Sequence, residues 1–335
     1  MTKIRTQEQR KESTEQRSTL TTTVPTPRSR REQTSLTNGN LTQRGLKLPQ
    51  HISYFSPISQ FFLPSIHHSS NMTEIPELGL GTWQNDKPEE CSNAVKTALN
   101  IGYRHIDTAQ AYENEEDVGK GLEQAKADRE DYFLASKVWI SNLAPENVKS
   151  STEESLEKLG VDSVDLMYIH WPSGDYQAQP TLEAFKELVE EGKIEKIGIS
   201  NFEPGQVDEA MEMAGEHIIA NQVEMHPLLQ QEELLEKCRE HGITLVAYSP
   251  LARGEVFNVP ELQEIAEKHD ASEAQVSLAW LMQKEGVVAI PKATSEEHIR
   301  DNYRALDLEL DEEDVEKIES INREERMVDP GFAPW

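Results

Sequence analysis

The chain has 335 residues and a formal net charge of −28 at pH 7, and this length accommodates one large α/β domain with an appendage. Two cysteines and no Cys/His cluster exclude a disulfide framework and a zinc site, and the acidic balance argues against nonspecific binding to nucleic acid. The longest apolar run near the start, residues 58–66, is too short to span a bilayer, so we expect a cytoplasmic protein with no metal and no membrane partner.

Residues 1–71 differ from the rest of the chain in composition and charge. They are rich in Ser, Thr, Gln and Arg, and they carry ten basic and four acidic residues. This composition buries too little apolar surface to fold, so it predicts a disordered extension, with a transit peptide as the alternative. Met72 stands directly before the change in composition, which leads to the hypothesis that translation starts there. We expect one folded domain over residues 72–335.

The segment 72–335 is strongly acidic, with 23 basic and 57 acidic residues. Salt screens the repulsion between like charges, so this excess suits a protein that stays soluble at high ionic strength. We therefore predict a halophilic protein from an acidic proteome. The alternative is an acidic cytosolic protein without salt adaptation, since net charge bears on solubility and not on fold.

From residue 72 onward, short apolar runs alternate with amphipathic segments. Apolar residues at i, i+3 and i+4 spacing predict helices, for example over 91–99, 147–159, 182–191 and 232–241. Strand–helix alternation of this kind predicts a single-domain α/β fold, a (β/α)8 TIM barrel. An open doubly wound sheet is the alternative, but the GxGxxG turn that usually follows its first strand is missing. The eight predicted strands cover residues 78–83, 104–108, 132–138, 164–171, 196–201, 221–226, 245–250 and 287–292.

Polar side chains follow nearly every predicted strand, as expected where the loops of a barrel build an active site. Asp107 ends the second strand, and Tyr112 follows one short loop later in the stretch GYRHIDTAQAYEN. Lys137 ends the third strand and His170 the fourth. Taken singly, each of these has an ordinary structural explanation, such as a capping group, a solvated charge or a core histidine. Their joint placement at three neighbouring strand ends makes them candidates for catalysis.

Together these four side chains can protonate a carbonyl oxygen. A tyrosine has an ordinary pKa of about 10, which a neighbouring Lys137 ammonium would lower, while Asp107 would keep that ammonium charged and oriented. His170 would hydrogen-bond the same substrate oxygen. Protonation of a carbonyl oxygen is useful when hydride reaches the carbon, so the group implies a nicotinamide cofactor.

In order, the chain contains the segments GYRHIDTAQAYENE, SKVW, DLMYIHWP, GISNF, NQVEMHP, YSPL and IPK. With these segments the chain resembles the aldo-keto reductases, and most closely the short bacterial or archaeal members of the 2,5-diketogluconate reductase kind. The resemblance covers residues 75–322. It implies a TIM barrel that reduces aldehydes and ketones to alcohols with NADPH, hydride passing from nicotinamide C4 to the carbonyl carbon. It also implies a catalytic tetrad of Asp107, Tyr112, Lys137 and His170, with Tyr112 as the general acid.

The resemblance also implies how the cofactor would bind. Three side chains, Ser200, Asn201 and Gln222, would hydrogen-bond the carboxamide of the nicotinamide. Tyr248 would stack on the nicotinamide ring and fix the face that delivers hydride. The path of the pyrophosphate would be lined by Ser249, Pro250 and Leu251.

One segment departs from the family pattern. Lys292 matches the lysine that pairs with the 2′-phosphate of NADP, but Ala293 and His298 stand where the family has Ser or Thr and an arginine. A mostly neutral histidine holds a phosphate less well than an arginine does. NADPH is the expected cofactor, and NADH is the alternative. The side chains that would still serve this end of the cofactor are Thr294, Ser295, His298, Asp301 and Asn302.

The implied substrate pocket is lined mainly by Trp83, Trp139, His170 and Trp171, beside Tyr112. Aromatic walls around a few polar groups suit a small aldehyde or ketone. The C-terminal aromatic residues, Phe332 and Trp335, either complete this wall or belong to an exposed tail. A monomer is expected. Two other functions stay open: a non-catalytic cofactor-binding accessory or redox-sensing subunit, and a barrel enzyme of another reaction type such as a lyase.

Overall fold

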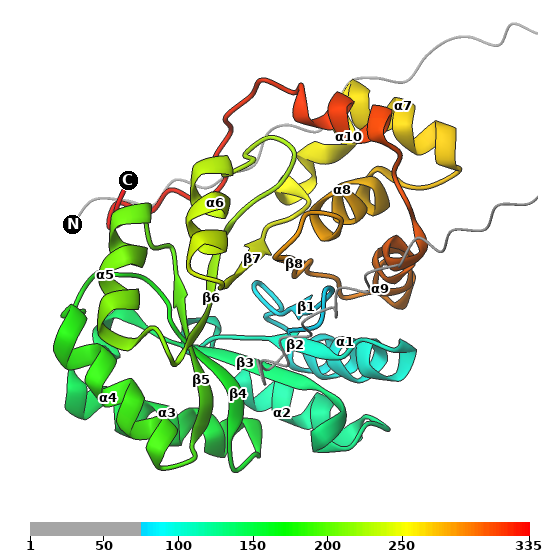
Figure 1. The fold of residues 1–335 in the computed structure, drawn as a ribbon. Coiled ribbons are helices and arrows are strands. Elements are labelled where there is room, and N and C mark those ends of the chain that lie inside the picture. Colours follow the sequence, from blue (N-terminus) through cyan, green and yellow to red (C-terminus); the bar gives the residue numbers. More distant parts are fainter. Residues whose placement is uncertain (1–74) are drawn as a thin grey trace, which may run out of the picture. The chain divides into compact units, whose positions relative to one another are not determined.

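The structure, a computed structural model, describes residues 75–335. The expectations on residues 1–71 and on a start at Met72 lie outside the described residues. From residue 75 onward, strands and helices alternate as predicted (Figure 1). The eight strands are β1 (Leu80–Gly81), β2 (His105–Asp107), β3 (Phe133–Val138), β4 (Val164–Ile169), β5 (Ile194–Ser200), β6 (Ile218–Glu224), β7 (Thr244–Tyr248) and β8 (Val287–Ala289).

All eight strands are parallel and pair in the order of the sequence, from β1 to β8. The first and last strands also meet, because the amide of Gly79 donates to the carbonyl of Ala289 at 2.9 Å and that of Gly81 to Pro291 at 3.0 Å. This seam closes the sheet. The predicted (β/α)8 barrel is therefore confirmed, and the open doubly wound sheet is excluded.

Several predicted strand ends are wrong by a few residues. Only two residues of the predicted strand 78–83 form β1, since Leu78 pairs with Ala289 as an isolated bridge. The strands predicted to reach Asn201 and Pro250 end at Ser200 and Tyr248. The next residues, Asn201 and Ser249, have φ angles of 62° and 48°, and this left-handed conformation ends an extended strand.

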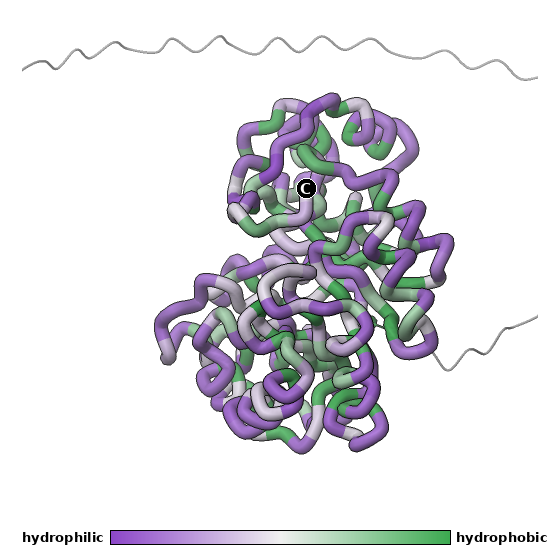
Figure 2. The backbone as a smooth tube through the Cα atoms, turned by 90° about the vertical axis from the view of Figure 1, so that its left-hand side faces the viewer, coloured by the Kyte–Doolittle hydropathy of each residue, from purple (hydrophilic) through white to green (hydrophobic). Residues whose placement is uncertain are grey.

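Helices follow the strands and cover the outside of the sheet (Figure 1). Four of them begin with a proline, whose fixed φ angle suits the first helical turn. Hydrophilic residues predominate along the outer turns (Figure 2). The helices are α1 (Pro88–Ile101), α2 (Glu115–Gln124), α3 (Pro145–Leu159), α4 (Ala178–Glu190), α5 (Pro204–Ala214), α6 (Glu232–Glu240), α7 (Pro260–His269), α8 (Glu273–Met282), α9 (Glu296–Tyr303) and α10 (Glu312–Glu319). Within residues 75–335, no helix combines the length and the apolar character needed to cross a membrane.

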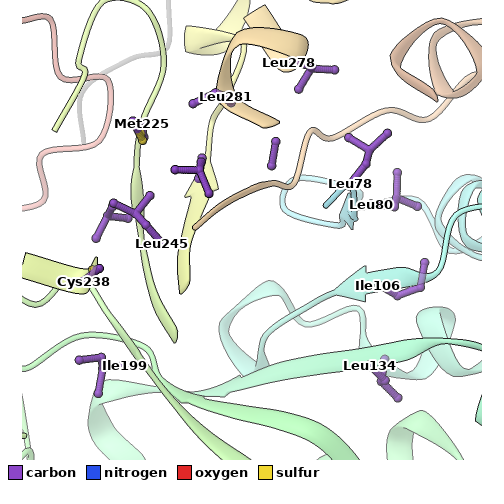
Figure 3. Packing of buried hydrophobic residues seen from close by; sticks show 14 of the residues in the cluster. Leu78, Leu80, Ile106, Leu134, Ile199, Met225, Cys238, Leu245, Leu278 and Leu281 are labelled. Carbon is purple, nitrogen blue, oxygen red and sulfur yellow. The ribbon is translucent and has the colours of Figure 1, made fainter. Parts of the chain in front are cut away.

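Two apolar layers lie on the two faces of the sheet. One packs strands against helices and includes Ile106, Leu134 and Ile199 (Figure 3). The other consists of strand residues of the opposite register, such as Phe133 and Tyr168, and fills the barrel interior. Because successive side chains of a strand point to opposite faces, this register decides which residues at the strand ends face the barrel axis.

Candidate active site

The side chains that face the barrel interior become polar at the carboxyl ends of the strands. In β3 the interior positions Phe133 and Ala135 are followed two residues later by Lys137. In β4 Tyr168 is followed in the same way by His170. The apolar layer therefore lies directly beneath a layer of polar side chains. This polar layer also includes Asp107, Gln222 and Tyr248, which come from β2, β6 and β7.

Asp107 and Lys137 form an ion pair in which each side chain is about 1–2% exposed. The ammonium also donates to the carbonyl oxygen of Thr108 at 2.8 Å. The second carboxylate oxygen of Asp107 accepts from Nε2 of Gln222 at 2.8 Å. Both charges are thus paired and hydrogen-bonded, and these interactions offset the desolvation cost of burying two ions.

Tyr112 ends a short 3₁₀ turn, η1 (Gln110–Tyr112), and its hydroxyl oxygen lies 3.4 Å from Nζ of Lys137. The side-chain amide of Gln110 fixes this turn, because both its nitrogen and its oxygen form hydrogen bonds. Its Nε2 donates to the carbonyl of Ser151 and to the hydroxyl of Ser155, at 3.1 and 3.2 Å. Its Oε1 accepts from the amide of Trp139 at 3.0 Å. The phenol is therefore anchored to both α3 and the end of β3.

His170 stands beside the phenol. Its ring lies 5.8 Å from that of Tyr112 and 5.1 Å from that of Trp139, edge to face in both cases. Burial lowers the pKa of His170 well below its ordinary value of 6.5, and the charge of Lys137 acts in the same direction. The imidazole is therefore neutral at physiological pH and can share a hydrogen bond with a substrate oxygen.

Burial also decides the protonation of the phenol. It raises the pKa of Tyr112 well above the ordinary value of 10.0, and the charge of Asp107 adds to the effect. The expectation of a lowered pKa is thus wrong in direction, because burial and the charge of Asp107 both disfavour the phenolate. Burial lowers the pKa of Lys137, while the charge of Asp107 opposes that shift. At neutral pH the phenol carries its proton, as a general acid must.

Side chains with amide and hydroxyl groups form a connected cluster beside this group. Asn201 donates from Nδ2 to the carbonyl of His170 at 3.0 Å and accepts from the hydroxyl of Tyr248 at 2.9 Å. Ser200 donates to the carbonyl of Gln222 at 2.8 Å. Tyr248 and Gln222 of this cluster line the same cavity.

A cavity of about 680 Å³ opens over these residues at the carboxyl ends of the strands. The four predicted catalytic residues do not all line it, since Lys137 lies beneath the surface behind Tyr112. All of the predicted substrate residues line it, as does Lys292 at another part of the wall. The predicted residues in the lining are Trp83, Asp107, Tyr112, Trp139, His170, Trp171, Ser200, Asn201, Gln222, Tyr248, Ser249 and Lys292.

Six residues predicted for the cofactor do not line this cavity. Ser295 caps α9 by accepting from the amide of His298, and the carbonyl of Pro250 accepts from Ser277. Asp301 is also engaged within the protein, since it accepts from Ser272 and Gln275. Their predicted roles in binding the cofactor stay predictions. The six are Pro250, Leu251, Thr294, Ser295, His298 and Asn302.

The C-terminal segment, residues 323–335, completes the aromatic wall. Phe332 lines the cavity, and its ring lies 5.9 Å from Trp139 and 5.4 Å from Trp171. Trp335 packs against Trp171 at 5.5 Å. The structure therefore places Phe332 in the wall, whereas Trp335 packs on Trp171 without lining the cavity, and both side chains are more than one third exposed.

Glu224 holds this segment in place. Its carboxylate is fully buried and accepts from the amides of Met327 and Val328, at 2.6 and 2.9 Å. It also pairs with His226 at 3.0 Å. Neither Glu224 nor Gln110 was singled out from the sequence. The only signal was their position inside the motifs NQVEMHP and GYRHIDTAQAYEN, since their partners lie about 100 and 40 residues away.

Known proteins match most of the described chain. The profile of the Aldo/keto reductase family matches residues 77–323. The chain is 41% identical over 260 residues to a 9,11-endoperoxide prostaglandin H2 reductase of Trypanosoma cruzi, covering 77% of this chain and 91% of that protein. It is 42% identical over 257 residues to a glyoxal reductase of Bacillus subtilis, covering 77% and 92%. A solved structure provisionally named 2,5-diketo-D-gluconic acid reductase B matches with a TM-score of 0.75 and 37% identity, covering 77% and 92%.

Proposed function

The chain belongs to the Aldo/keto reductase family, and from this premise we propose that it reduces aldehydes and ketones to alcohols with NADPH. It is an oxidoreductase that uses a nicotinamide cofactor, as members of this family do. One observation carries the proposed chemistry: the hydroxyl of Tyr112 lies beside the buried ammonium of Lys137, at a cavity with aromatic walls.

In the proposed reaction Tyr112 gives its proton to the carbonyl oxygen. Lys137 lies 3.4 Å from the phenol oxygen, so its charge stabilises the phenolate that remains after the transfer. Asp107 holds Lys137 in place and keeps the buried pair neutral overall. His170, neutral and beside the phenol, orients the substrate oxygen by a hydrogen bond. When bound, the nicotinamide would supply the hydride that reaches the carbonyl carbon.

The residues around the cavity fit such a cofactor. Tyr248 offers an aromatic face, and the amides of Asn201 and Gln222 lie next to it. Lys292 also lines the cavity, and its ammonium has no carboxylate partner within residues 75–335. An unpaired ammonium in an acidic protein suits an anionic group of the cofactor. We assign Lys292 to the 2′-phosphate, which favours NADPH over NADH.

The test is Tyr112→Phe in the full chain, with Tyr132→Phe as a matched control outside the cavity. Loss of the general acid should lower turnover of a reactive aldehyde by at least about 100-fold, while the affinity for NADPH stays within about twofold. Wild-type activity in Tyr112→Phe would sink the proposed mechanism. Cofactor binding by the wild type without turnover of any aldehyde would favour the accessory-subunit function instead. Equal rates with NADPH and NADH would contradict the cofactor preference.

A further inference from the structure

A further buried carboxylate, that of Glu115, lies behind the catalytic group. Glu115 begins α2, three residues after Tyr112 at the end of η1, and only 2% of it is exposed. It is not among the residues that line the cavity, so it is not placed to contact a substrate or a cofactor. Burial of a carboxylate is costly unless hydrogen bonds and charges compensate. Its partners therefore indicate what this carboxylate does for the site.

The main partner of Glu115 is Ser136 of β3. The hydroxyl of Ser136 donates to Oε1 of Glu115 at 2.6 Å, and both residues are buried. Ser136 directly precedes Lys137 in the strand. Because neighbouring side chains of a strand point to opposite faces, Ser136 faces the helices while Lys137 faces the barrel interior. The hydrogen bond therefore joins the segment that carries Tyr112 to the strand that carries Lys137.

The same hydrogen bond favours the anionic form of Glu115. Burial raises the pKa of this carboxyl group above its ordinary value of 4.5, and the hydrogen bond from Ser136 opposes that shift. Two charged residues of α3, Lys158 and Glu154, act on the pKa of Glu115 in opposite directions. They also form an ion pair with each other at 2.6 Å, so their effects largely cancel. Ser136 is therefore the group that most favours a negative charge on Glu115.

The charge of Glu115 acts on the ammonium of Lys137. Burial lowers the pKa of Lys137, and the charges of Asp107 and Glu115 both oppose that shift. Asp107 contacts the ammonium directly, whereas Glu115 acts from the helix side of β3. Two anions, one on each face of the strand, thus favour the protonated form of Lys137. This form is the one that can stabilise a phenolate on Tyr112.

We propose that Glu115 is a positioning residue of the reductase: its hydrogen bond with Ser136 sets the distance between the hydroxyl of Tyr112 and the ammonium of Lys137, and its negative charge supports that ammonium. This inference rests on the proposed reductase function. It goes beyond it by assigning a role to a residue that contacts neither substrate nor cofactor. The hydroxyl and the ammonium are 3.4 Å apart, which is long for a hydrogen bond. A small displacement of η1 away from β3 would therefore weaken their interaction.

Two substitutions in the full chain separate the charge from the hydrogen bond. Glu115→Gln removes the charge but keeps an oxygen that accepts from Ser136, whereas Ser136→Ala removes the hydrogen bond and leaves the carboxyl group in place. The control is Glu116→Gln, which removes a charge from an exposed residue in the same turn of α2.

The readout is the pH profile of kcat/KM for a reactive aldehyde with NADPH. Loss of a nearby negative charge favours deprotonation of both Tyr112 and Lys137. In Glu115→Gln the fall of kcat/KM at high pH should therefore begin at least about 0.5 pH unit lower than in the wild type. In Ser136→Ala, kcat should drop at least about tenfold, with the KM for NADPH unchanged within about twofold. The control should match the wild type.

Either of two results would overturn the inference: a wild-type kcat in Ser136→Ala, or an unchanged pH profile in Glu115→Gln. A lower melting temperature with unchanged kinetics in both variants would overturn it as well, because Glu115 would then serve the fold alone.

A titration of 13C-labelled lysines, followed by NMR, tests the effect of the charge without turnover. The signal of Lys137 is identified by its absence in Lys137→Met. It should titrate at a lower pH in Glu115→Gln than in the wild type and in Glu116→Gln, and equal midpoints in all three proteins would contradict the inference. If the shift is seen while no aldehyde is reduced, the reductase proposal fails and the coupling of Glu115 to Lys137 stands.

Discussion

His105 shows what burial does to a single titratable side chain. It is fully buried at the start of β2, its ring contacts Phe133 edge to face at 5.2 Å, and neither ring nitrogen has a hydrogen-bond partner within the described chain. Burial lowers its pKa from 6.5 to about 4, and the charge of Asp107 only partly opposes this. The site therefore requires a neutral imidazole, in contrast to Asp107 and Lys137, which stay buried as a pair.

This residue predicts a pH dependence of stability. In the unfolded chain His105 takes up a proton as the pH falls below about 6.5, whereas in the folded protein it does so only near pH 4. Acid thus favours the unfolded state, and up to about 3 kcal/mol of stability is lost between these two values. The free energy of unfolding, measured by urea denaturation, should therefore fall less between pH 7 and pH 4.5 in His105→Leu than in the wild type. His217→Gln, a change at a surface histidine, should keep the pH dependence of the wild type. The same pH dependence in His105→Leu and the wild type would refute the assignment.

At the scale of elements, the barrel is closed by its shortest strand. β1 contributes two residues, and an added Cβ on Gly81 would lie 2.8 Å from the carbonyl oxygen of Ile290. That oxygen is backbone and cannot move aside without opening the seam between β1 and β8. The close approach of the two backbones explains why a glycine stands at this position.

Gly81→Ala should therefore destabilise the protein by about 1–3 kcal/mol. The control is Gly205→Ala, because Gly205 lies in the first turn of α5 and a Cβ added there would meet no neighbouring group within 4 Å. There alanine should be neutral or stabilise by up to about 1 kcal/mol. Chemical denaturation of both variants measures the difference. Equal stability of the two variants would show that the seam tolerates a side chain.

The C-terminal segment is an element without regular secondary structure, and the carboxylate of Glu224 is one of the groups that hold it. The carboxylate of Glu224 accepts hydrogen bonds from two backbone amides. A hydrogen bond to a charged group contributes about 1.5–3 kcal/mol, and Glu224→Gln removes this charge. We expect the segment to detach, with the KM for an aldehyde raised about tenfold and the KM for NADPH unchanged. Glu236→Gln, at an exposed position of α6, is the control. Limited proteolysis should cut Glu224→Gln within residues 323–335 faster than the control, and equal rates would argue against the clamp.

At the scale of the whole molecule, charge is the dominant feature. The formal net charge of −28 implies self-repulsion in the folded state, which salt screens. The melting temperature of the full chain should rise by several degrees between 0.1 and 2 M KCl. Sucrose at equal osmolality is the control, since it is excluded from the protein surface but does not screen charge. An equal rise in sucrose would remove the reason to expect salt adaptation. The monomeric state stays a prediction that light scattering measures.

The sequence by itself determined the fold class, the family and the identity of the residues at the strand ends. These features are encoded locally: apolar periodicity separates strands from helices, and Asp107, Tyr112, Lys137 and His170 stand within short motifs of fixed order. Parallel strands then bring such ends together regardless of detail. The sequence was less accurate about where strands end, because the apolar pattern does not indicate that Asn201 and Ser249 take left-handed backbone conformations.

Only the tertiary structure decided how the rim of the cavity is built. Glu224 meets the amides of Met327 and Val328 across about 100 residues of chain, and Arg253 lies over Trp83 across an even longer separation. No local pattern encodes contacts of this kind, because they exist only once the barrel has closed. The direction of the pKa of Tyr112 was likewise set by burial, a property of the packed protein that the order of residues does not state.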